Sequence, residues 1–465
     1  MAAKSLAPGP RREDCRDAAA PAKRSHATDR FNRPLTSLAP PRSPLRVAAL
    51  VDLPRSARAG GHVKYWERLA AVAAEPADGE APLDLTVYFS GDAPDETIAP
   101  NVRLRHLPPV FSTQRLKFLP YVPDHTDLAP WHPRLARQLP RYDLIHATDG
   151  FFAFARTAER VARSRGIPLT TSLHTDTPAY ARLFTRQTIE ALCARRPWLQ
   201  RKLIDDWGVP ERQGARMDRR LARHLRQCAH AFVTRAEDQV LAQGVLDAAR
   251  VSLIRVGVDK AMFGPHRRDI VGVRRDYAIP EDRVIALFVG RVDAGKNVGV
   301  LKEAVAQAIA KGAPLHLIVA GLGPMAQDLA QALDNRVSLP GFVEPDELAR
   351  LYASVDFLAL PSEVEIHSMA AVEAIASGCP AMVARAAGST SQFGATPAVL
   401  AVDGGTRNWA AAMRDLAADP ERREAMRQAA LAYRDARPAS WSEALYEDFL
   451  PGWRAALSAT RGDLA

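Results

Sequence analysis

Short apolar segments recur along the chain from residue 45 onwards, and each is bounded by Gly, Pro or charged residues. They are rich in Val, Ile, Leu and Phe, which is typical of parallel strands buried on both faces of a sheet. Those in the first half of the chain lie at 45–51, 83–89, 142–147, 169–173, 231–234 and 251–256. Those in the second half lie at 284–290, 315–321, 355–361 and 379–384. The pattern predicts two successive series of buried strands.

The segments between these strands carry apolar residues at helical spacing. One stripe, at positions i, i+3, i+4, i+7 and i+8, is Leu301, Ala304, Val305, Ala308 and Ile309. Another, at i, i+3, i+4 and i+7, is Leu348, Leu351, Tyr352 and Val355. A stripe of this kind is the side of a helix that packs on a core. Strands that alternate with helices predict an α/β fold with two open, parallel sheets.

The chain of 465 residues is too long for one ordinary core, so more than one domain is expected. Residues 1–44 are rich in Ala, Pro, Arg and Ser without periodicity, which predicts a disordered tail. A polar segment after Met262–Gly264 predicts a boundary there, between an N-terminal domain at 45–262 and a C-terminal domain at 263–430. Residues 431–465 are amphipathic around Trp441–Trp453 and predict a C-terminal helix that could close either domain.

Composition excludes several classes of protein. The four cysteines are far apart and form no C-x-x-C pair, so a disulfide framework or a cysteine zinc site is not expected and a reducing cytosol fits best. No apolar run reaches the ~18 residues of a membrane span, and no secretory signal is recognisable. A cytoplasmic protein, at most peripheral at the inner face of a membrane, is therefore expected. No carboxylate cluster has metal-ligand spacing, so neither a metal nor a cofactor is predicted.

Residues 180–226 differ from the rest of the chain. They hold 12 Arg or Lys and 5 Asp or Glu, so +7 of the net charge of +9 lies here. Aromatic residues, among them Tyr180, Phe184, Trp198 and Trp207, lie between the charges. Two interpretations stay open, a solvated helical excursion between two strands or a surface that touches anionic lipid headgroups. No helix-turn-helix, RNP or zinc pattern is present, so no nucleic-acid partner is expected.

The first motif with chemical meaning is GRVDAGK at 290–296, directly after a predicted strand. Ligands of open α/β sheets bind at the carboxyl ends of the strands. Arg291 can fork onto phosphate oxygens while Lys296 supplies a point charge, so the pair suits a diphosphate. Two surface cations in a loop are the alternative interpretation.

The second motif is PSEVEIHSMAAVEAIASGCPAMVA at 361–384, in which Glu365 and Glu373 are eight residues apart. Glu365 is expected in the loop, where it can accept hydrogen bonds from sugar hydroxyls. Glu373 is expected in the following helix, where it can bind both hydroxyls of a ribose. The amides near Met369 and Ala370 begin that helix, and helix N-termini favour anions.

The run from Val284 to Ala384 resembles the retaining glycosyltransferases of the group 1 or family 4 type, which have the GT-B fold. The matching segments, in order, are FVGRVDAGKN, LHLIVAGLGPM, VSLPGFVEPDELARLYASVDFLALPS, the E-x7-E pair and ASGCPAMVA. Weaker matches upstream are AGGHVKYWERLA, YDLIHATD, TTSLHTD and RVGVDKAMFGP. The resemblance implies two Rossmann-like, parallel-sheet domains that face a cleft.

The resemblance also implies roles for individual residues. Arg291 and Lys296 would neutralise the donor diphosphate, Glu365 would contact the transferred sugar, and Glu373 would bind the ribose. Val343, after the turn at Gly341, would lie near the base.

Other implied roles fall in the N-terminal domain. The backbone of Gly60 and Gly61 would approach the diphosphate closely, which residues without Cβ allow. His174, at a strand end, would lie near the reacting sugar and the acceptor, and His146 could share that place. The alternative for both histidines is a structural role at a strand end.

One loop departs from the family pattern. The family has Gly-Phe-Gly after the first glutamate, and this chain has Ile366-His367-Ser368. His367 could read a carboxylate or phosphate on the donor, or could replace Phe as packing. The identity of the sugar therefore stays open.

The function implied is that of a hexosyltransferase, which moves a sugar from a nucleotide diphosphate sugar to a hydroxyl acceptor. UDP-sugars are the first expectation and GDP-mannose is the second. The basic segment at 180–226 suits a lipid or lipid-linked acceptor at an anionic membrane surface. A nucleotide-sugar epimerase, a phosphorylase or a non-catalytic GT-B binding module are the alternatives, because the fold alone does not decide function.

Overall fold

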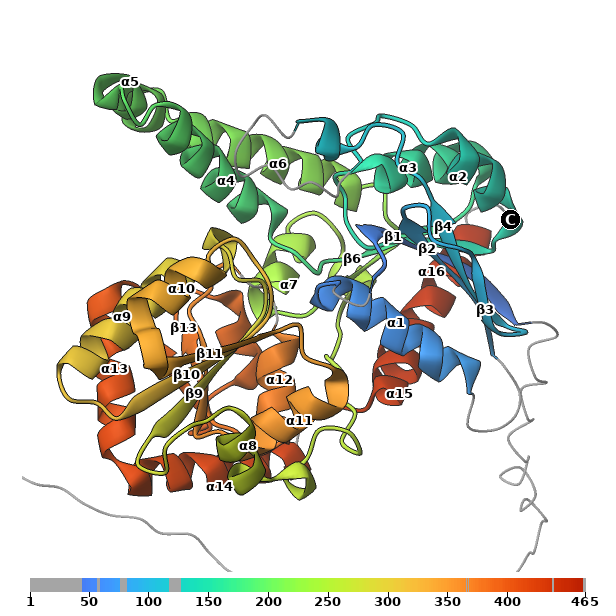
Figure 1. The fold of residues 1–465 in the computed structure, drawn as a ribbon. Helices are drawn as coiled ribbons and strands as arrows, with labels where there is room; N and C mark the ends of the chain where they lie inside the picture. Colours follow the sequence, from blue (N-terminus) through green and yellow to red (C-terminus); the bar gives the residue numbers. More distant parts are fainter. Residues whose placement is uncertain are drawn as a thin grey trace, which may run out of the picture. The chain divides into compact units, whose positions relative to one another are not determined.

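The computed structural model describes residues 44–56, 59–75, 82–116, 127–364, 366, 368–436 and 439–462. The tail predicted for residues 1–44 lies outside them except for its last residue, as do Glu365 and His367. Figure 1 shows the two sheets and the helices around them. No described helix combines the length and the apolar character needed to cross a bilayer.

The N-terminal sheet contains eight strands in the order β3-β4-β2-β1-β5-β6-β7-β8. Their bounds are β1 Leu45–Pro54, β2 Leu83–Ser90, β3 Glu96–Ala99, β4 Val102–Leu107, β5 Leu144–Ala147, β6 Leu169–Ser172, β7 His230–Val233 and β8 Val251–Leu253. Strand β1 pairs with β2 on one side and with β5 on the other. All pairs are parallel except the one at the edge, where β3 runs antiparallel to β4.

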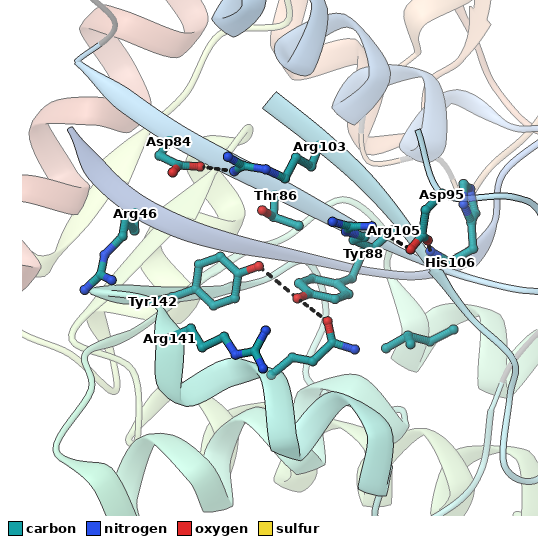
Figure 2. A pocket seen from close by; sticks show the side chains of 12 residues that line it. Arg46, Asp84, Thr86, Tyr88, Asp95, Arg103, Arg105, His106, Arg141 and Tyr142 are labelled. Atoms are coloured by element: carbon teal, nitrogen blue, oxygen red, sulfur yellow. Dashed lines mark hydrogen bonds and ion pairs between the residues drawn. The ribbon is translucent and has the colours of Figure 1, made fainter. Parts of the chain in front are cut away.

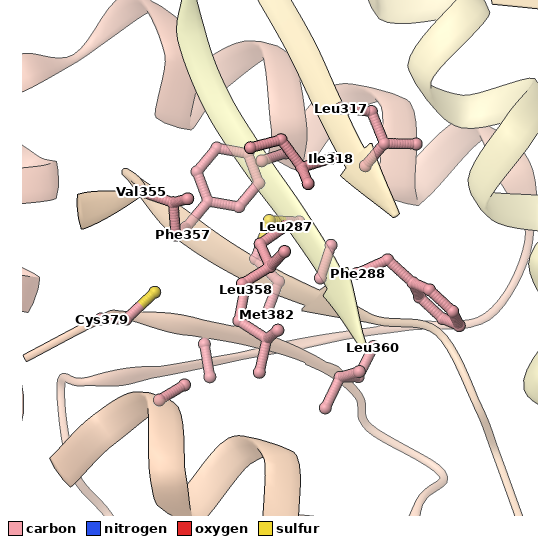
Figure 3. Close-up of a cluster of buried hydrophobic side chains, with 14 of the residues drawn as sticks. Leu287, Phe288, Leu317, Ile318, Val355, Phe357, Leu358, Leu360, Cys379 and Met382 are labelled. Carbon is pink, nitrogen blue, oxygen red and sulfur yellow. The ribbon is translucent and has the colours of Figure 1, made fainter. Parts of the chain in front are cut away.

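The C-terminal sheet contains six parallel strands in the order β11-β10-β9-β12-β13-β14. Their bounds are β9 Val284–Val289, β10 Leu315–Ala320, β11 Val337–Gly341, β12 Phe357–Leu360, β13 Ala381–Ala384 and β14 Val399–Val402. Figure 3 shows apolar side chains from β9, β10 and β12 on both faces of these strands. The second series of strands predicted from the sequence therefore forms one buried sheet.

Helices cover the sheets. Those of the C-terminal part are α8 Ile270–Asp276, α9 Val298–Ala310, α10 Ala326–Leu333, α11 Pro345–Ser354, α12 Met369–Ala376, α13 Thr406–Ala418 and α14 Pro420–Ala436. The α9 stripe predicted from the sequence is fully buried in the core except for Ile309, which is partly buried and packs against that core. Those on the N-terminal sheet include α1 Gly61–Ala74, α2 Pro133–Gln138, α3 Ala153–Arg165 and α7 Ala236–Gln243.

The end of the chain returns to the N-terminal sheet. After α14 come α15 Trp441–Glu443 and, following a π-helical turn, α16 Leu450–Gly462. Trp441, Phe449 and Trp453 share a core with Trp66 and Phe232 of the N-terminal part. The sequence left open which domain this segment closes, and in the structure it closes the N-terminal one.

Residues 177–225 form a helical hairpin between β6 and β7. Its helices are α4 Thr177–Leu192, α5 Pro197–Arg201 and α6 Val209–Leu225. Helices α4 and α6 pack side by side and extend away from the sheet, with α5 at the far end (Figure 1). A small core of Ile189, Cys193 and Ile204 stabilises that end.

Candidate functional site

Each sheet contains one point where the strand order reverses. In the C-terminal sheet the chain moves outward from β9 to β10 and β11, and then to the other side with β12. In the N-terminal sheet the same reversal falls between β1 and β5. Ligands of open α/β sheets bind at the carboxyl ends of strands at such points. The glycine pair follows β1, and the GRVDAGK motif follows β9.

The loop after β9 holds two cations close together. Gly290 has a φ of +145°, a conformation that side chains disfavour. Arg291 follows it, half-exposed, with its guanidinium 3.2 Å from a carboxylate oxygen of Asp293. The other oxygen of Asp293 accepts the backbone N–H of Lys296 at 3.1 Å. Lys296 turns back beside Gly290, because its Cε lies 4.0 Å from where a Cβ would stand.

A second turn supports this loop. Backbone N–H groups of Gly290 and Val292 donate to the carbonyls of Ala320 and Leu322. A Cβ on Gly323 would lie only 2.2 Å from the carbonyl oxygen of Val292, so the contact requires glycine. The G-x-G-P turn at 321–324 is therefore a brace for the cationic loop.

Helix α12 begins at the same edge of the C-terminal sheet, where the carboxyl ends of its parallel strands lie. The side chain of Ser368 caps it by accepting the N–H of Ala371 at 3.2 Å. The N–H groups of a first helical turn have no partner inside the helix, so those of Met369 and Ala370 carry partial positive charge. Ser368 stands where the family has its second Gly of Gly-Phe-Gly, and Ile366 beside it is buried. Glu365 lies outside the described residues.

Glu373 lies one turn into α12 and is partly buried. The hydroxyl of Tyr352 donates to its carboxylate at 3.4 Å. Burial raises the pKa of Glu373 to about 7, while the charge of Arg68 and the Tyr352 hydrogen bond act in the opposite direction. Arg68 comes from α1, so the two halves of the chain meet at this carboxylate.

The N-terminus of α1 faces the N-terminus of α12. Gly60 is the N-cap of α1, and nothing lies within 4 Å of where its Cβ would be. At Gly61 a Cβ would touch the sulfur of Met369 at 3.4 Å. Two helix N-termini therefore converge from the two domains, and both favour a bound anion. The segment before α12 contacts the cationic loop, because Asn297 donates to the carbonyl of Pro361 at 3.2 Å.

A buried hydrogen-bond chain leads to His174. Trp453 donates its indole N–H to Nδ1 of His146 at 3.2 Å, and Nε2 of His146 lies 2.9 Å from Ser172 Oγ. Ser172 Oγ lies 2.7 Å from Nε2 of His174. Because an indole can only donate, Nδ1 of His146 accepts, and the chain leaves Nε2 of His174 accepting from Ser172. Burial holds the pKa of His146 well below its usual range, so His146 is a neutral core residue.

His174 itself lies at the end of β6, with other rings around it. His62, directly after the glycine pair, stacks on it with ring centroids 4.6 Å apart. Tyr65 contacts it at 4.8 Å. Neither His62 nor Tyr65 was singled out from the sequence, because the helical register of α1 decides which of its residues reach the site.

Val343 follows β11 at the edge of the sheet and packs partly against the C-terminal core. A Cβ on Gly341 would lie 3.3 Å from Leu322 of the bracing turn. The turn at Gly341, two residues before Val343, therefore packs against the brace.

A cavity of about 330 Å³ opens beside His174. Its charged lining residues are Asp149, Asp176, Asp218, Glu237, Asp238, Arg182 and Arg235. Arg182 pairs with Asp218 at 2.5 Å, and Arg235 pairs with Asp238 at 2.5 Å. Five carboxylates against two guanidiniums leave this cavity with a formal charge of −3. Ile366 of the C-terminal domain also lines it.

A second cavity, of about 500 Å³, lies along β2 and β4 of the N-terminal sheet (Figure 2). Tyr88 donates to Gln138 at 2.9 Å and shares a 2.8 Å hydrogen bond with Tyr142. Arg46, at the start of β1, lines it as well.

Comparison with known proteins agrees with this geometry. Residues 272–432 match the family model described as glycosyl transferases group 1. D-inositol 3-phosphate glycosyltransferase 1 of Catenulispora acidiphila is 30% identical over 336 residues, covering 69% of this chain and 74% of that protein. Further curated relatives match over 43 to 49% of their own length, so the chain spans about half of each of them.

Solved structures show the same fold. Sucrose-phosphate synthase of Thermosynechococcus elongatus superposes with a TM-score of 0.64 at 18% identity, over 90% of this chain and 100% of that one. HepE of Anabaena, solved with UDP and glucose, superposes with a TM-score of 0.58 at 17% identity, over 87% of this chain and 98% of that one. The two parallel-sheet domains are those of the GT-B fold. The chain belongs to the group 1 glycosyltransferases and is a hexose-transferring enzyme.

Proposed function

We propose that this enzyme transfers a hexose from a nucleotide diphosphate sugar to a hydroxyl of a lipid or lipid-linked glycan, with retention of anomeric configuration. The observation that supports the donor proposal is the convergence of two helix N-termini, one of which follows a segment in contact with the loop of Arg291 and Lys296. Helix N-termini and cations together would neutralise a diphosphate. UDP is the first candidate, because HepE, which shares the fold, was solved with UDP; GDP is the second.

The reaction breaks the bond between the anomeric carbon and a diphosphate oxygen and forms a bond to the acceptor oxygen. Positive charge develops on the sugar ring, and negative charge develops on the departing diphosphate. Arg291, Lys296 and the first amides of α12 stabilise the latter. Retention requires the acceptor to approach on the face that the diphosphate leaves, so a diphosphate oxygen can take the acceptor proton. Glu365 is proposed to hold the transferred sugar, Glu373 the ribose, and His174 to orient the acceptor.

The cavity beside His174 is proposed as the acceptor site. Its formal charge is −3, and both of its guanidiniums already lie in ion pairs. A phosphate group would meet no uncompensated cation there, whereas sugar hydroxyls can donate to the carboxylates. We therefore propose that the reacting part of the acceptor is an uncharged polyol or sugar. In this respect the chain would differ from the relative that is named for inositol 3-phosphate.

A thermal-shift screen against UDP, GDP, ADP and dTDP tests the donor proposal, with Arg291→Ala alongside. A ligand that binds only the folded state raises the melting temperature by mass action. We expect one diphosphate to raise it and the shift to be lost in Arg291→Ala, with Arg385→Ala, an exposed arginine elsewhere, as the control. If no nucleotide shifts a folded sample, the donor proposal is wrong. Turnover of the sugar nucleotide without acceptor would instead indicate an epimerase.

A further inference from the structure

Exposed arginines form a stripe along one side of α6 and its C-cap. They are Arg212, Arg216, Arg219, Arg223 and Arg226. Their spacing of four, three, four and three residues places them on one face of the helix. Among the residues that the structure describes, none of the five forms an ion pair with a carboxylate. The acidic residues of α6, Glu211 and Asp218, pair with Arg182 of α4 instead.

The far end of the hairpin exposes large apolar side chains. Trp198 is 65% exposed, Trp207 is 48% exposed and Leu192 is 61% exposed. By contrast, Trp66 and Trp453 are fully buried. Exposed tryptophan is costly in water, so two at one projecting end indicate a surface that is covered in use.

Exposed cations lie among these apolar residues, together with the exposed carboxylates of Glu190, Asp205 and Asp206. Arg195, Arg196 and Arg201 are exposed around Trp198. The ammonium of Lys202 lies 5.4 Å from the ring centroid of Trp207. Tryptophan prefers the boundary between lipid headgroups and acyl chains, and each cation near an anionic bilayer adds attraction. A membrane with anionic lipids provides both an interface for the tryptophans and negative charge for the cations.

We infer that the α4–α6 hairpin is a membrane-docking element, in which Trp198, Trp207 and Leu192 insert at the level of the headgroups and the arginine stripe binds anionic lipid. The inference rests on the proposed lipid acceptor and names the surface where the enzyme meets it.

The base of the same hairpin lines the proposed acceptor cavity. Arg182 of α4 and Asp218 and Leu221 of α6 are among its lining residues. Helix α6 rises ~1.5 Å per residue, so Asp218 lies only about 15 Å from Gly208 at the tip end. One rigid element therefore joins the docking surface to the cavity, at a distance that the headgroup of a glycolipid can bridge.

Vesicle flotation of the full-length protein tests this inference, with neutral phosphatidylcholine vesicles compared with vesicles that also contain phosphatidylglycerol. We expect binding to the anionic vesicles only. Arg212→Gln/Arg216→Gln/Arg219→Gln should weaken it by about a hundredfold, since each cation contributes about a fivefold factor. Trp198→Ala/Trp207→Ala should weaken it by about tenfold or more. Trp198→Phe should retain most of it.

Matched controls come from the C-terminal domain. Val271→Ser removes a side chain that is 77% exposed there, and Arg422→Gln removes an exposed arginine, so neither should change vesicle binding. Unchanged binding in the hairpin variants would overturn the inference. Equal binding to a DNA duplex, lost with the arginines but indifferent to the tryptophans, would also overturn it in favour of a nucleic-acid partner. The nucleotide thermal shift is measured on the same variants, so a failed donor proposal is distinguishable from failed docking.

Discussion

At the scale of single residues, the chemistry of the donor site depends on charge and burial together. Arg291 and Lys296 were predicted as a pair from spacing, and the structure places them in one short loop. Arg68, which acts on Glu373 from α1, could not be foreseen because no local pattern relates residues that are about 300 positions apart. His146 illustrates the reverse case, since its motif suggested a site whereas its ring is buried among Thr170, Ser172 and Trp453.

Glu373 gives the stability of the protein a pH dependence. Its pKa is about 7 in the folded chain against 4.5 ordinarily, so the folded state holds a proton that the unfolded chain releases between these values. Folding stability from this group is therefore lost as pH rises from about 4.5 to 7. Glu373→Gln stays neutral, so this group no longer makes its stability depend on pH. Relative to wild type, its free energy of unfolding should therefore rise by up to about 3 kcal/mol between pH 5 and pH 8.

Urea unfolding at the two pH values measures this difference, with Glu363→Gln, an exposed neighbour, as the matched control. The same titration bears on the ribose, because an ionised carboxylate accepts hydrogen bonds from both hydroxyls. UDP affinity of the wild type should rise as pH passes 7, and that of Glu373→Gln should be lower and flat. A flat profile in both proteins would contradict the ribose role.

At the scale of elements, the sequence predicted the central strands and the edge strand β8, and missed β3, β4, β11 and β14, which lie at the other edges or next to one. Strand β3, ETIA, is exposed along its length, and β11, VSLPG, ends in Pro and Gly and is only half-buried. Edge strands face solvent on one side, so their sequences lack the continuous apolar run that reveals a buried strand. The bounds of the predicted domains stay a prediction, because the last helices cross from one to the other.

The brace formed by the G-x-G-P turn is testable at this scale. Gly323→Ala forces a methyl group against the backbone of Val292, so we expect a loss of about 1–3 kcal/mol in the free energy of unfolding and weaker binding of UDP. Gly299→Ala is the control, because its Cβ would have 3.7 Å of room inside α9, where alanine is the better helix former. Chemical denaturation and the nucleotide thermal shift would both be measured. Equal stability and equal nucleotide thermal shifts in the two variants would show that the turn does not support the cationic loop.

At the scale of the whole molecule, the last helix completes the first domain. Trp453 is fully buried against Phe449, Phe232 and His146. We expect Trp453→Ala to cost about 3–5 kcal/mol in the free energy of unfolding, because it leaves a large cavity. Trp198→Ala removes the same side chain from an exposed position and should cost far less. Similar losses in urea denaturation of the two variants would show that α16 does not close the N-terminal core.

The return of the chain end has a consequence for synthesis. The core that joins Tyr65 and Trp66 of α1 to Phe232 of β7 is completed by residues 441–456. A ribosome that adds roughly 5–20 residues per second needs on the order of ten seconds or more to travel from Phe232 to that segment. During this interval the nascent first domain displays aromatic surface that chaperones can hold. A message truncated before codon 441 would release a product that never hides this surface and is therefore prone to aggregation and proteolysis.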